Sequence, residues 1–184
     1  ANGESSANGN SGGSNSLIST GDSRTVTVYN ARTGSNVTDT IFNIVAGMTQ
    51  NEVGDNYGTS FYSEAIKAQA VACRTYLEYC LQSGTPTVYI KTPCQSVTSA
   101  VQSTSGQKMY YNGRLIQATY FAISCGNTNS SSDVWGGSLP YLQSVSSPYD
   151  KNVSGYKRTA TFSQAEVISK IRSSTGINLD PEHP

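Results

Sequence analysis

The segment Glu64–Tyr76, with the sequence EAIKAQAVACRTY, is the centre of a predicted helix that begins at Ser60 or Ser63 and ends before Gly84. Glycine often follows the last turn of a helix, because it adopts the left-handed conformation that terminates one. Small side chains let a neighbouring helix or sheet approach closely, so an alanine-rich face predicts a central helix. The predicted apolar face consists of Ala65, Ala68, Ala72, Cys73, Tyr76 and Cys80.

Polar residues of this helix lie in two places. Gln69 falls in the middle of the apolar face, where a buried amide needs hydrogen-bond partners. It either ties two backbone segments together or faces a cleft. Arg74 and Glu78 lie on the other side and have the i, i+4 spacing of a helical ion pair.

The elements around the central helix are segregated along the chain rather than alternating, which is typical of an α+β fold. The Asn-Gly pair at 112–113 predicts a tight hairpin turn between two apolar runs. The sequence therefore predicts a helical core around the alanine-rich central helix, with antiparallel β-hairpins. The predicted elements are a strand at 25–31, a helix at 39–53 with Asp39 as its N-cap, a strand at 86–92, a hairpin within 108–123 and a helix opened by the capping box at 163–166.

Glu52 is the polar residue that stands out in the helix before the central one. The apolar stripe of that helix ends at Met48, and a further step of four residues reaches Glu52. Either the helix has ended there and the carboxylate points to water, or Glu52 lines a cleft beside packed side chains. In the second case partial desolvation would raise its pKa and keep it protonated, as a general acid requires. The stripe consists of Ile41, Ile44, Val45 and Met48.

Charge is sparse and balanced in this chain of 184 residues, with 12 basic and 12 acidic side chains and a formal net charge of zero. We therefore expect no basic surface for nucleic acid. The single histidine is His183, the second-last residue of the sequence. A catalytic triad or a histidine-type zinc site needs an imidazole held by the fold, so neither is expected. Proton chemistry would have to come from a carboxylate, a tyrosine or a lysine.

Composition also predicts how the chain is organised. Residues 1–23 form a predicted flexible linker rich in Asn, Gly and Ser, and residues 24–184 form a single globular domain. No apolar run reaches the roughly 18 residues that a membrane span needs. We expect an exported protein of the cell envelope or extracellular space, its globular part held on a stalk, either free or anchored through a segment before the linker.

The four cysteines form no metal-binding or redox pair in the sequence. Cys73 and Cys80 share the predicted central helix, where a rise of about 1.5 Å per residue puts their α-carbons roughly 10 Å apart. That distance is too long for a disulfide. Cys94 and Cys125 lie in predicted non-helical segments, so they either form a disulfide or remain free thiols like the other two.

Three motifs together resemble the stage II sporulation protein D (SpoIID/LytB) family. The first is EAIKAQAVACRTY itself, which is close to the signature helix of that family. In the preceding helix, Gly47 followed by Glu52 fits the family pattern of a glycine and then a glutamate. Downstream, the segment Val134–Val145 (VWGGSLPYLQSV) is similar to a further family motif. The chain departs from the family at Asn127, which stands where the second glycine of a pair is usual.

The resemblance implies a lytic transglycosylase of bacterial peptidoglycan, acting on glycan strands stripped of their stem peptides. The catalytic residue of the family is a glutamate in the first helix, and by position this is Glu52. No cofactor is implied. Some relatives hold a metal with cysteine and histidine, but the only histidine here is His183, so we expect no metal. The residues expected to hold the sugar are Gln69, Arg74, Gln95, Ser124 and Thr128, and Trp135 either stacks on a sugar or anchors the core beside Pro140 and Tyr141.

Two other functions remain as alternatives. One is a non-catalytic module that binds glycan, or an activator of a cell-wall amidase, because one branch of the family is described as an amidase enhancer. Such a module would not need an acid on an apolar helix face. The other is a structural coat or adhesion domain, which low charge and many Ser, Asn and Tyr residues would suit.

Overall fold

The computed structural model describes residues 22–54 and 62–182. The chain divides into two compact units, residues 1–120 and 121–184. The expectation of one domain over residues 24–184 remains a prediction. Most of the predicted linker (residues 1–21), residues 55–61 and His183 lie outside the described residues.

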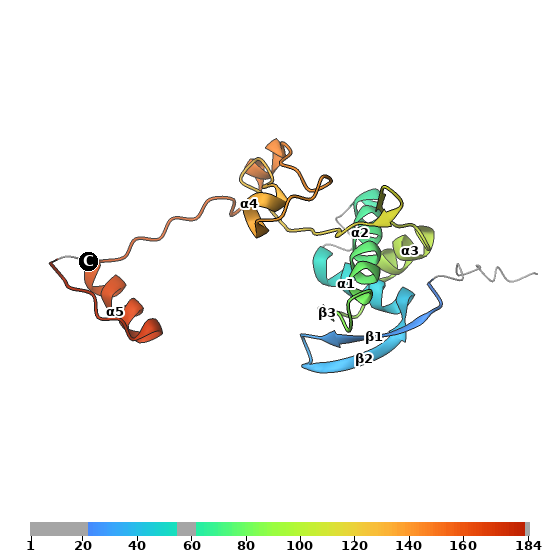
Figure 1. Ribbon diagram of the computed structural model, residues 1–184, viewed down its shortest axis with the longest axis horizontal. Helices are drawn as coiled ribbons and strands as arrows, with labels where there is room; N and C mark the ends of the chain where they lie inside the picture. Colours follow the sequence, from blue (N-terminus) through green and yellow to red (C-terminus); the bar gives the residue numbers. More distant parts are fainter. Residues whose placement is uncertain (1–21, 55–61, 183–184) are drawn as a thin grey trace, which may run out of the picture. The chain divides into compact units, whose positions relative to one another are not determined.

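A three-stranded sheet opens the first unit, with the strand order β2-β1-β3 (Figure 1). β1 (Thr25–Asn30) confirms the predicted first strand and turns Val26 and Val28 into the core. It pairs antiparallel with β2 (Ser35–Thr40) along its whole length and parallel with β3 (Thr87–Val88). The strand predicted at 86–92 is thus much shorter than expected. The sequence does not predict β2, because SNVTDT contains a single apolar side chain.

α1 (Ile41–Val53) confirms the predicted first helix. Its N-cap is Thr40 rather than Asp39, because the Thr40 hydroxyl accepts a hydrogen bond from the Asn43 amide. The Asp39 carboxylate instead accepts from the Thr40 amide. The predicted apolar stripe is fully buried and consists of Ile41, Ile44, Val45 and Met48.

α2 (Ser63–Leu81) packs against both α1 and α3 (Gln95–Ser103), which confirms its predicted central place (Figure 1). The predicted apolar face is wrong, because Ala65 and Ala68 are exposed. Alanine carries too little apolar surface to decide which face is buried, whereas isoleucine and leucine decide it. The buried stripe is Ile66, Ala70, Cys73 and Leu77.

α3 is a helix that the sequence does not predict. Its segment QSVTSAVQS is mostly polar, and its apolar side chains Val97, Ala100 and Val101 are the ones buried. The buried Gln50 joins the start of α3 to the end of α1. Its Oε1 accepts from the Cys94 amide at 2.9 Å, and its Nε2 donates to the Gly54 carbonyl at 2.8 Å.

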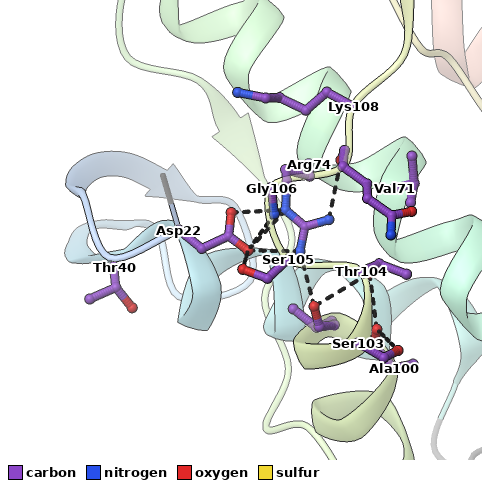
Figure 2. Close-up of polar contacts among 12 residues, drawn as sticks. Asp22, Thr40, Val71, Arg74, Ala100, Ser103, Thr104, Ser105, Gly106 and Lys108 are labelled. Atoms are coloured by element: carbon purple, nitrogen blue, oxygen red, sulfur yellow. Dashed lines mark hydrogen bonds and ion pairs between the residues drawn. The ribbon is translucent and has the colours of Figure 1, made fainter. Parts of the chain in front are cut away.

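A buried ion pair crosses the first unit between Arg74 of α2 and Asp22 (Figure 2). Arg74 Nη2 lies 2.9 Å from Asp22 Oδ2, and the Arg74 Nε donates to the same carboxylate. Ser105 Oγ also donates to it, at 2.7 Å. The predicted Arg74–Glu78 pair is therefore wrong, and Glu78 pairs with Lys108 instead. Asp22 belongs to the folded unit, although the sequence assigns it to the linker.

The Asn112-Gly113 turn joins β4 (Tyr110–Tyr111) to β5 (Arg114–Leu115), as predicted. Both turn residues have positive φ, 49° and 75°, which is the conformation that this hairpin turn requires. The strands are only two residues long, so the hairpin expected within 108–123 is much shorter than the sequence predicts. Its longer apolar runs continue outside the ladder.

The second unit contains α4 (Ser131–Trp135), a 3-10 helix (Pro148–Asn152) and α5 (Gln164–Thr175). α5 confirms the predicted last helix, including the capping box between Ser163 and Glu166. Every buried apolar side chain of the described residues lies in the first unit, at or before Ala118. The two ends of α4 and α5 are instead fixed by polar caps and by left-handed glycines.

The described residues contain neither a membrane-spanning helix nor a cluster of metal-binding side chains. No helix there combines the length and the apolar character that crossing a membrane requires. Over residues 22–54 and 62–182, no group of three or more His, Cys, Asp or Glu side chains could hold a metal ion.

Candidate active site

A cleft of about 320 Å³ lies on the first unit. α1 and α2 form part of its wall, and the segment around β3 and the residues after β5 form the rest. Three of its side chains are tyrosines, and one carries a formal charge, Glu52. The lining residues are Met48, Glu52, Tyr76, Thr87, Val88, Tyr89, Thr119 and Tyr120.

Glu52 lies one turn after Met48, and both side chains line the cleft, as the spacing in α1 predicts. The helix continues to Val53 and is capped at Gly54, so it has not ended at Glu52. The Glu52 side chain is nevertheless exposed to water, as that alternative predicts, rather than partly desolvated. Asn51 Nδ2 donates to its Oε1 at 3.1 Å. Glu52 is thus an accessible carboxylate at the end of a packed helix.

Tyr76 and Tyr120 pack edge to face in the cleft wall, with ring centroids 6.1 Å apart and planes at 68°. Burial raises the pKa of Tyr120, and the neighbouring Cys73 and Glu52 raise it further. Burial also raises the pKa of Tyr76. Both phenols therefore keep their protons at neutral pH and act as neutral hydrogen-bonding groups.

Gln69 supports the cleft indirectly, through hydrogen bonds that pass by way of Cys73. Its Nε2 donates to Cys73 Sγ at 3.4 Å, and Cys73 Sγ in turn donates to the Tyr120 hydroxyl at 3.6 Å. Gln69 is only partly buried and does not line the cleft. It makes neither a tie between backbones nor a direct wall of the cleft, but supports a tyrosine that does line it.

Arg74 is wrongly predicted as a sugar-binding residue. Its side chain is 0% exposed, and its guanidinium is occupied by Asp22 and by the carbonyls of Val101 and Gln107. No surface of it is left for a substrate. Gln95 is exposed at the start of α3, where its Nε2 donates to Ser99, and it is not among the residues that line the cleft.

The other predicted sugar-binding residues belong to the second unit. Ser124 is buried and donates to Asp150 Oδ2 at 2.5 Å, while the Thr128 hydroxyl accepts from the Val145 amide. Trp135 on α4 is 58% exposed, so the alternative in which it anchors a core is wrong. Their roles toward a sugar remain predictions.

The loop around Ser124 also explains one departure from the family pattern. Gly126 has φ of 94°, in the left-handed region that favours glycine. Asn127 does not share this conformation and instead pairs with Ser146 in an isolated antiparallel bridge. A second glycine is therefore not required by the backbone here, and the asparagine fits.

All four cysteines are free thiols in this structure. Cys94 and Cys125 are exposed and belong to different units, so a disulfide between them remains a prediction. Cys73 is buried, and burial raises its pKa, which keeps the thiol protonated. Its role in the structure is that of a hydrogen-bonding group rather than of a ligand or a bridge.

Sequence reasoning missed the tyrosines of the cleft. The sequence predicts Tyr76 only as part of an apolar helix face, and it predicts no functional role for Tyr89 or Tyr120. The one available signal is the abundance of tyrosine, 12 residues in a chain with sparse charge. That signal says nothing about which tyrosines come together, because the cleft joins segments that are distant in the sequence.

Comparison with known proteins bears directly on this cleft. The family model for SpoIID, stage II sporulation protein, matches residues 45–111, which include Glu52, Tyr76 and Tyr89. Stage II sporulation protein D of Bacillus subtilis (strain 168) is 32% identical over 156 residues. Residues 45–111 of the chain therefore match the stage II sporulation protein D family. The homologous protein of Bacillus amyloliquefaciens is 30% identical over 148 residues.

The SpoIID-family relatives are longer than this chain. The match to the Bacillus subtilis protein covers 70% of the chain and 44% of that relative, and the match to the Bacillus amyloliquefaciens protein covers 65% and 43%. The chain is also 36% identical over 120 residues to an amidase enhancer of Bacillus subtilis (strain 168), covering 60% of the chain and 16% of the relative. The chain thus spans less than half the length of these curated relatives.

Proposed function

We propose that this chain is a sporulation-associated lytic transglycosylase that cleaves peptidoglycan glycan strands stripped of their stem peptides. The observation that carries the proposal is the position of Glu52, the one charged side chain among the described residues that line a cleft built on a packed helix. The family that the chain matches, and the names of its relatives, support a role at the cell wall during sporulation. Such a role places the protein outside the cytoplasm, in the cell envelope.

Glu52 first acts as a general acid in this mechanism. Its carboxylic acid protonates the oxygen that links N-acetylmuramic acid to the next N-acetylglucosamine, and the bond between that oxygen and C1 breaks. The resulting carboxylate then accepts the proton from the 6-hydroxyl of the same muramic acid. The 6-oxygen forms a bond to C1, which gives a 1,6-anhydro ring.

A single carboxylate is sufficient for this reaction. Glycosidases that use water or a covalent intermediate generally need two carboxyl groups, one of them to activate water or to attack C1. Here the nucleophile belongs to the sugar that is cleaved, so it is held close to C1 without a second catalytic group. The cleft matches this requirement, because Glu52 is the only carboxylate among the described residues that line it.

The test is digestion of purified glycan strands without stem peptides, with products identified by mass spectrometry. The wild-type protein is expected to produce strands with 1,6-anhydro ends, and Glu52→Gln to lower their rate of formation by at least about 100-fold, because it removes the proton donor. Glu64→Gln makes the same chemical change at an exposed carboxylate of α2, outside the cleft lining, so it is the matched control and should retain most activity. Equal product from the wild-type and Glu52→Gln proteins would exclude this function.

A second candidate function rests on the similarity to the amidase enhancer. In that case the protein binds glycan and increases the activity of a cell-wall amidase, without cleaving the strands itself. Adding the Glu52→Gln protein to an amidase digestion separates the two functions. Undiminished stimulation by a variant that forms no 1,6-anhydro ends would favour the activator.

A further inference from the structure

Three hydrogen-bonding groups in the first unit form a chain with one direction. Gln69 Nε2 donates to Cys73 Sγ at 3.4 Å, and Cys73 Sγ donates to the hydroxyl oxygen of Tyr120 at 3.6 Å. Cys73 Sγ therefore accepts the first hydrogen bond and donates the second. Hydrogen bonds in such a chain polarise one another and strengthen the last donor.

The last donor of this chain is the Tyr120 hydroxyl. Its oxygen accepts from Cys73, so its own proton can only be donated elsewhere. In the part of the chain that the structure describes, no hydrogen bond from this hydroxyl to an acceptor is present. Tyr120 lines the same cleft as Glu52, and its ring is held against Tyr76. The donor is thus fixed in place and available to a molecule in the cleft.

The protonation states of Cys73 and Tyr120 support this arrangement. Burial raises the pKa of Cys73, so the thiol holds the proton that it donates. Burial also raises the pKa of Tyr120, and Cys73 and Glu52 act in the same direction. The end of the chain is consequently a neutral O–H group over the whole range of physiological pH. The lining residues that the structure describes include no cation, so a ligand oxygen is bound here by hydrogen bonds rather than by an ion pair.

We propose that Tyr120 is a substrate-binding residue that donates a hydrogen bond to an oxygen of the sugar held beside Glu52, and that Cys73 is the residue that positions it. This inference rests on the proposed function, since it takes the ligand to be a glycan. The sugar oxygens that can accept are ring hydroxyls, the carbonyl of an N-acetyl group and the lactyl carboxylate of the muramic acid. Tyr120 fixes where the sugar lies relative to the Glu52 carboxylate.

Binding of stripped glycan strands to the Glu52→Gln protein tests this without turnover, for example by isothermal titration calorimetry. Replacing Tyr120 by Phe in that background removes one hydrogen bond, so binding should weaken by about threefold to tenfold. Tyr110→Phe removes the same atom from an exposed tyrosine of the hairpin, outside the cleft lining, and should leave binding unchanged. Thermal unfolding of each variant shows that the fold is retained.

Cys73 is tested by a double-mutant cycle with Tyr120. If it acts by positioning, Cys73→Ala weakens binding roughly two- to fivefold when Tyr120 is present and has no further effect in Tyr120→Phe. Cys73→Ser, which keeps a donor to the tyrosine, should restore most of the affinity. A merely structural role would instead give equal losses in both backgrounds and no rescue by serine.

The possible outcomes separate this inference from the proposed function. No binding by the Glu52→Gln protein would overturn both. Strong binding that Tyr120→Phe leaves unchanged would overturn the role of Tyr120 and leave the proposed function standing. Equal effects of Cys73→Ala in the two backgrounds would overturn its positioning role, whereas coupled effects with rescue by serine support the whole chain.

Discussion

Arg74 is the largest fully buried side chain of the described residues, and it is charged. Its guanidinium is acceptable in the core because Asp22 and backbone carbonyls occupy its donors. Removing one partner of such a pair leaves the other charge buried and uncompensated. We therefore expect Arg74→Ala to lower the free energy of unfolding by about 3–5 kcal/mol, measured by urea denaturation.

The matched control is the exposed ion pair on the same helix. Lys67 Nζ lies 2.6 Å from Glu64 Oε1, but both side chains are in contact with solvent. Exposed pairs contribute little, so Lys67→Ala should change the free energy of unfolding by less than about 1 kcal/mol. A loss below 1 kcal/mol for Arg74→Ala as well would show that the Asp22 pair is not a fixed part of the core.

Glu52 and Arg74 differ in how well their surroundings could be predicted from the sequence. Glu52 could be found because its position follows from the spacing of its own helix, which is local. The partner of Arg74 lies 52 residues away in the sequence, in a segment whose composition resembles a linker. The nearby Glu78 therefore appeared to be the partner, although tertiary packing pairs it with Lys108.

At the scale of elements, Gly47 determines how closely α1 approaches the chain after β3. A Cβ at this position would collide with Ile90 Cγ2 and would lie 3.2 Å from the Lys91 carbonyl oxygen. The Lys91 amide also donates to the Gly47 carbonyl at 3.1 Å. The glycine is thus required by packing, which gives a physical reason for the glycine in the family pattern.

We expect Gly47→Ala to destabilise the protein. Alanine favours a helix interior by up to about 1 kcal/mol over glycine, whereas overpacking costs about 1–3 kcal/mol. The clash should prevail because one of the two contacts is with backbone, leaving a net loss of roughly 1–2 kcal/mol in thermal or urea unfolding. Gly137→Ala is the control, since its Cβ would meet open space, and should change stability by less than about 0.5 kcal/mol.

The loop of the second unit is held by a carboxylate that titrates at low pH. The Ser124 hydroxyl and amide donate to Asp150 and hold its pKa below the ordinary value. A lowered pKa in the folded state means that this contribution to stability is present at neutral pH and is lost as the pH falls through the folded pKa. It should therefore disappear in the acid range, below about pH 4.

Ser124→Ala should raise the pKa of Asp150 toward its ordinary value, because it removes the Ser124 hydroxyl, the largest of the groups that lower this pKa, and leaves the Ser124 amide and the Ser147 side chain. The change can be followed by NMR titration of the side-chain carboxyl carbons. Asp133, whose pKa is lowered in the same way by Ser130, the N-cap of α4, serves as an internal reference and should not move. A pKa of Asp150 that stays the same in the variant would contradict the assigned cause.

Elements with strong local signals were predictable, and elements fixed by tertiary pairing were not. The Asn112-Gly113 turn and the capping box at Ser163 depend on residues next to each other, and both are present. β2 and α3 are polar segments whose structure depends on partners elsewhere, β1 for the strand and α1 and α2 for the helix. Their few apolar residues are too sparse to give a clear period.

At the scale of the whole molecule, the sparse charge of the chain matches the hydroxyl-rich lining of the cleft. The chain has a formal net charge of zero, and only 13% of its residues are charged. Among the lining residues of the cleft, uncharged hydroxyl groups outnumber the one carboxylate. Recognition through such a surface depends on hydrogen bonds and aromatic contact rather than on ion pairs. The sequence predicts this character through composition alone, but the tyrosines that provide it are brought together only by folding.

This character predicts that glycan binding depends little on salt. Ionic strength screens interactions between exposed charges but leaves neutral hydrogen bonds and stacking almost unchanged. The affinity of the Glu52→Gln protein for stripped glycan strands should therefore change by less than about threefold between 50 and 500 mM NaCl, whereas a protein that neutralises several phosphates or carboxylates would lose orders of magnitude. Binding can be measured by calorimetry at each salt concentration. A loss of tenfold or more would show that cations outside the cleft hold the strand, and would require a charged site in addition to the tyrosines.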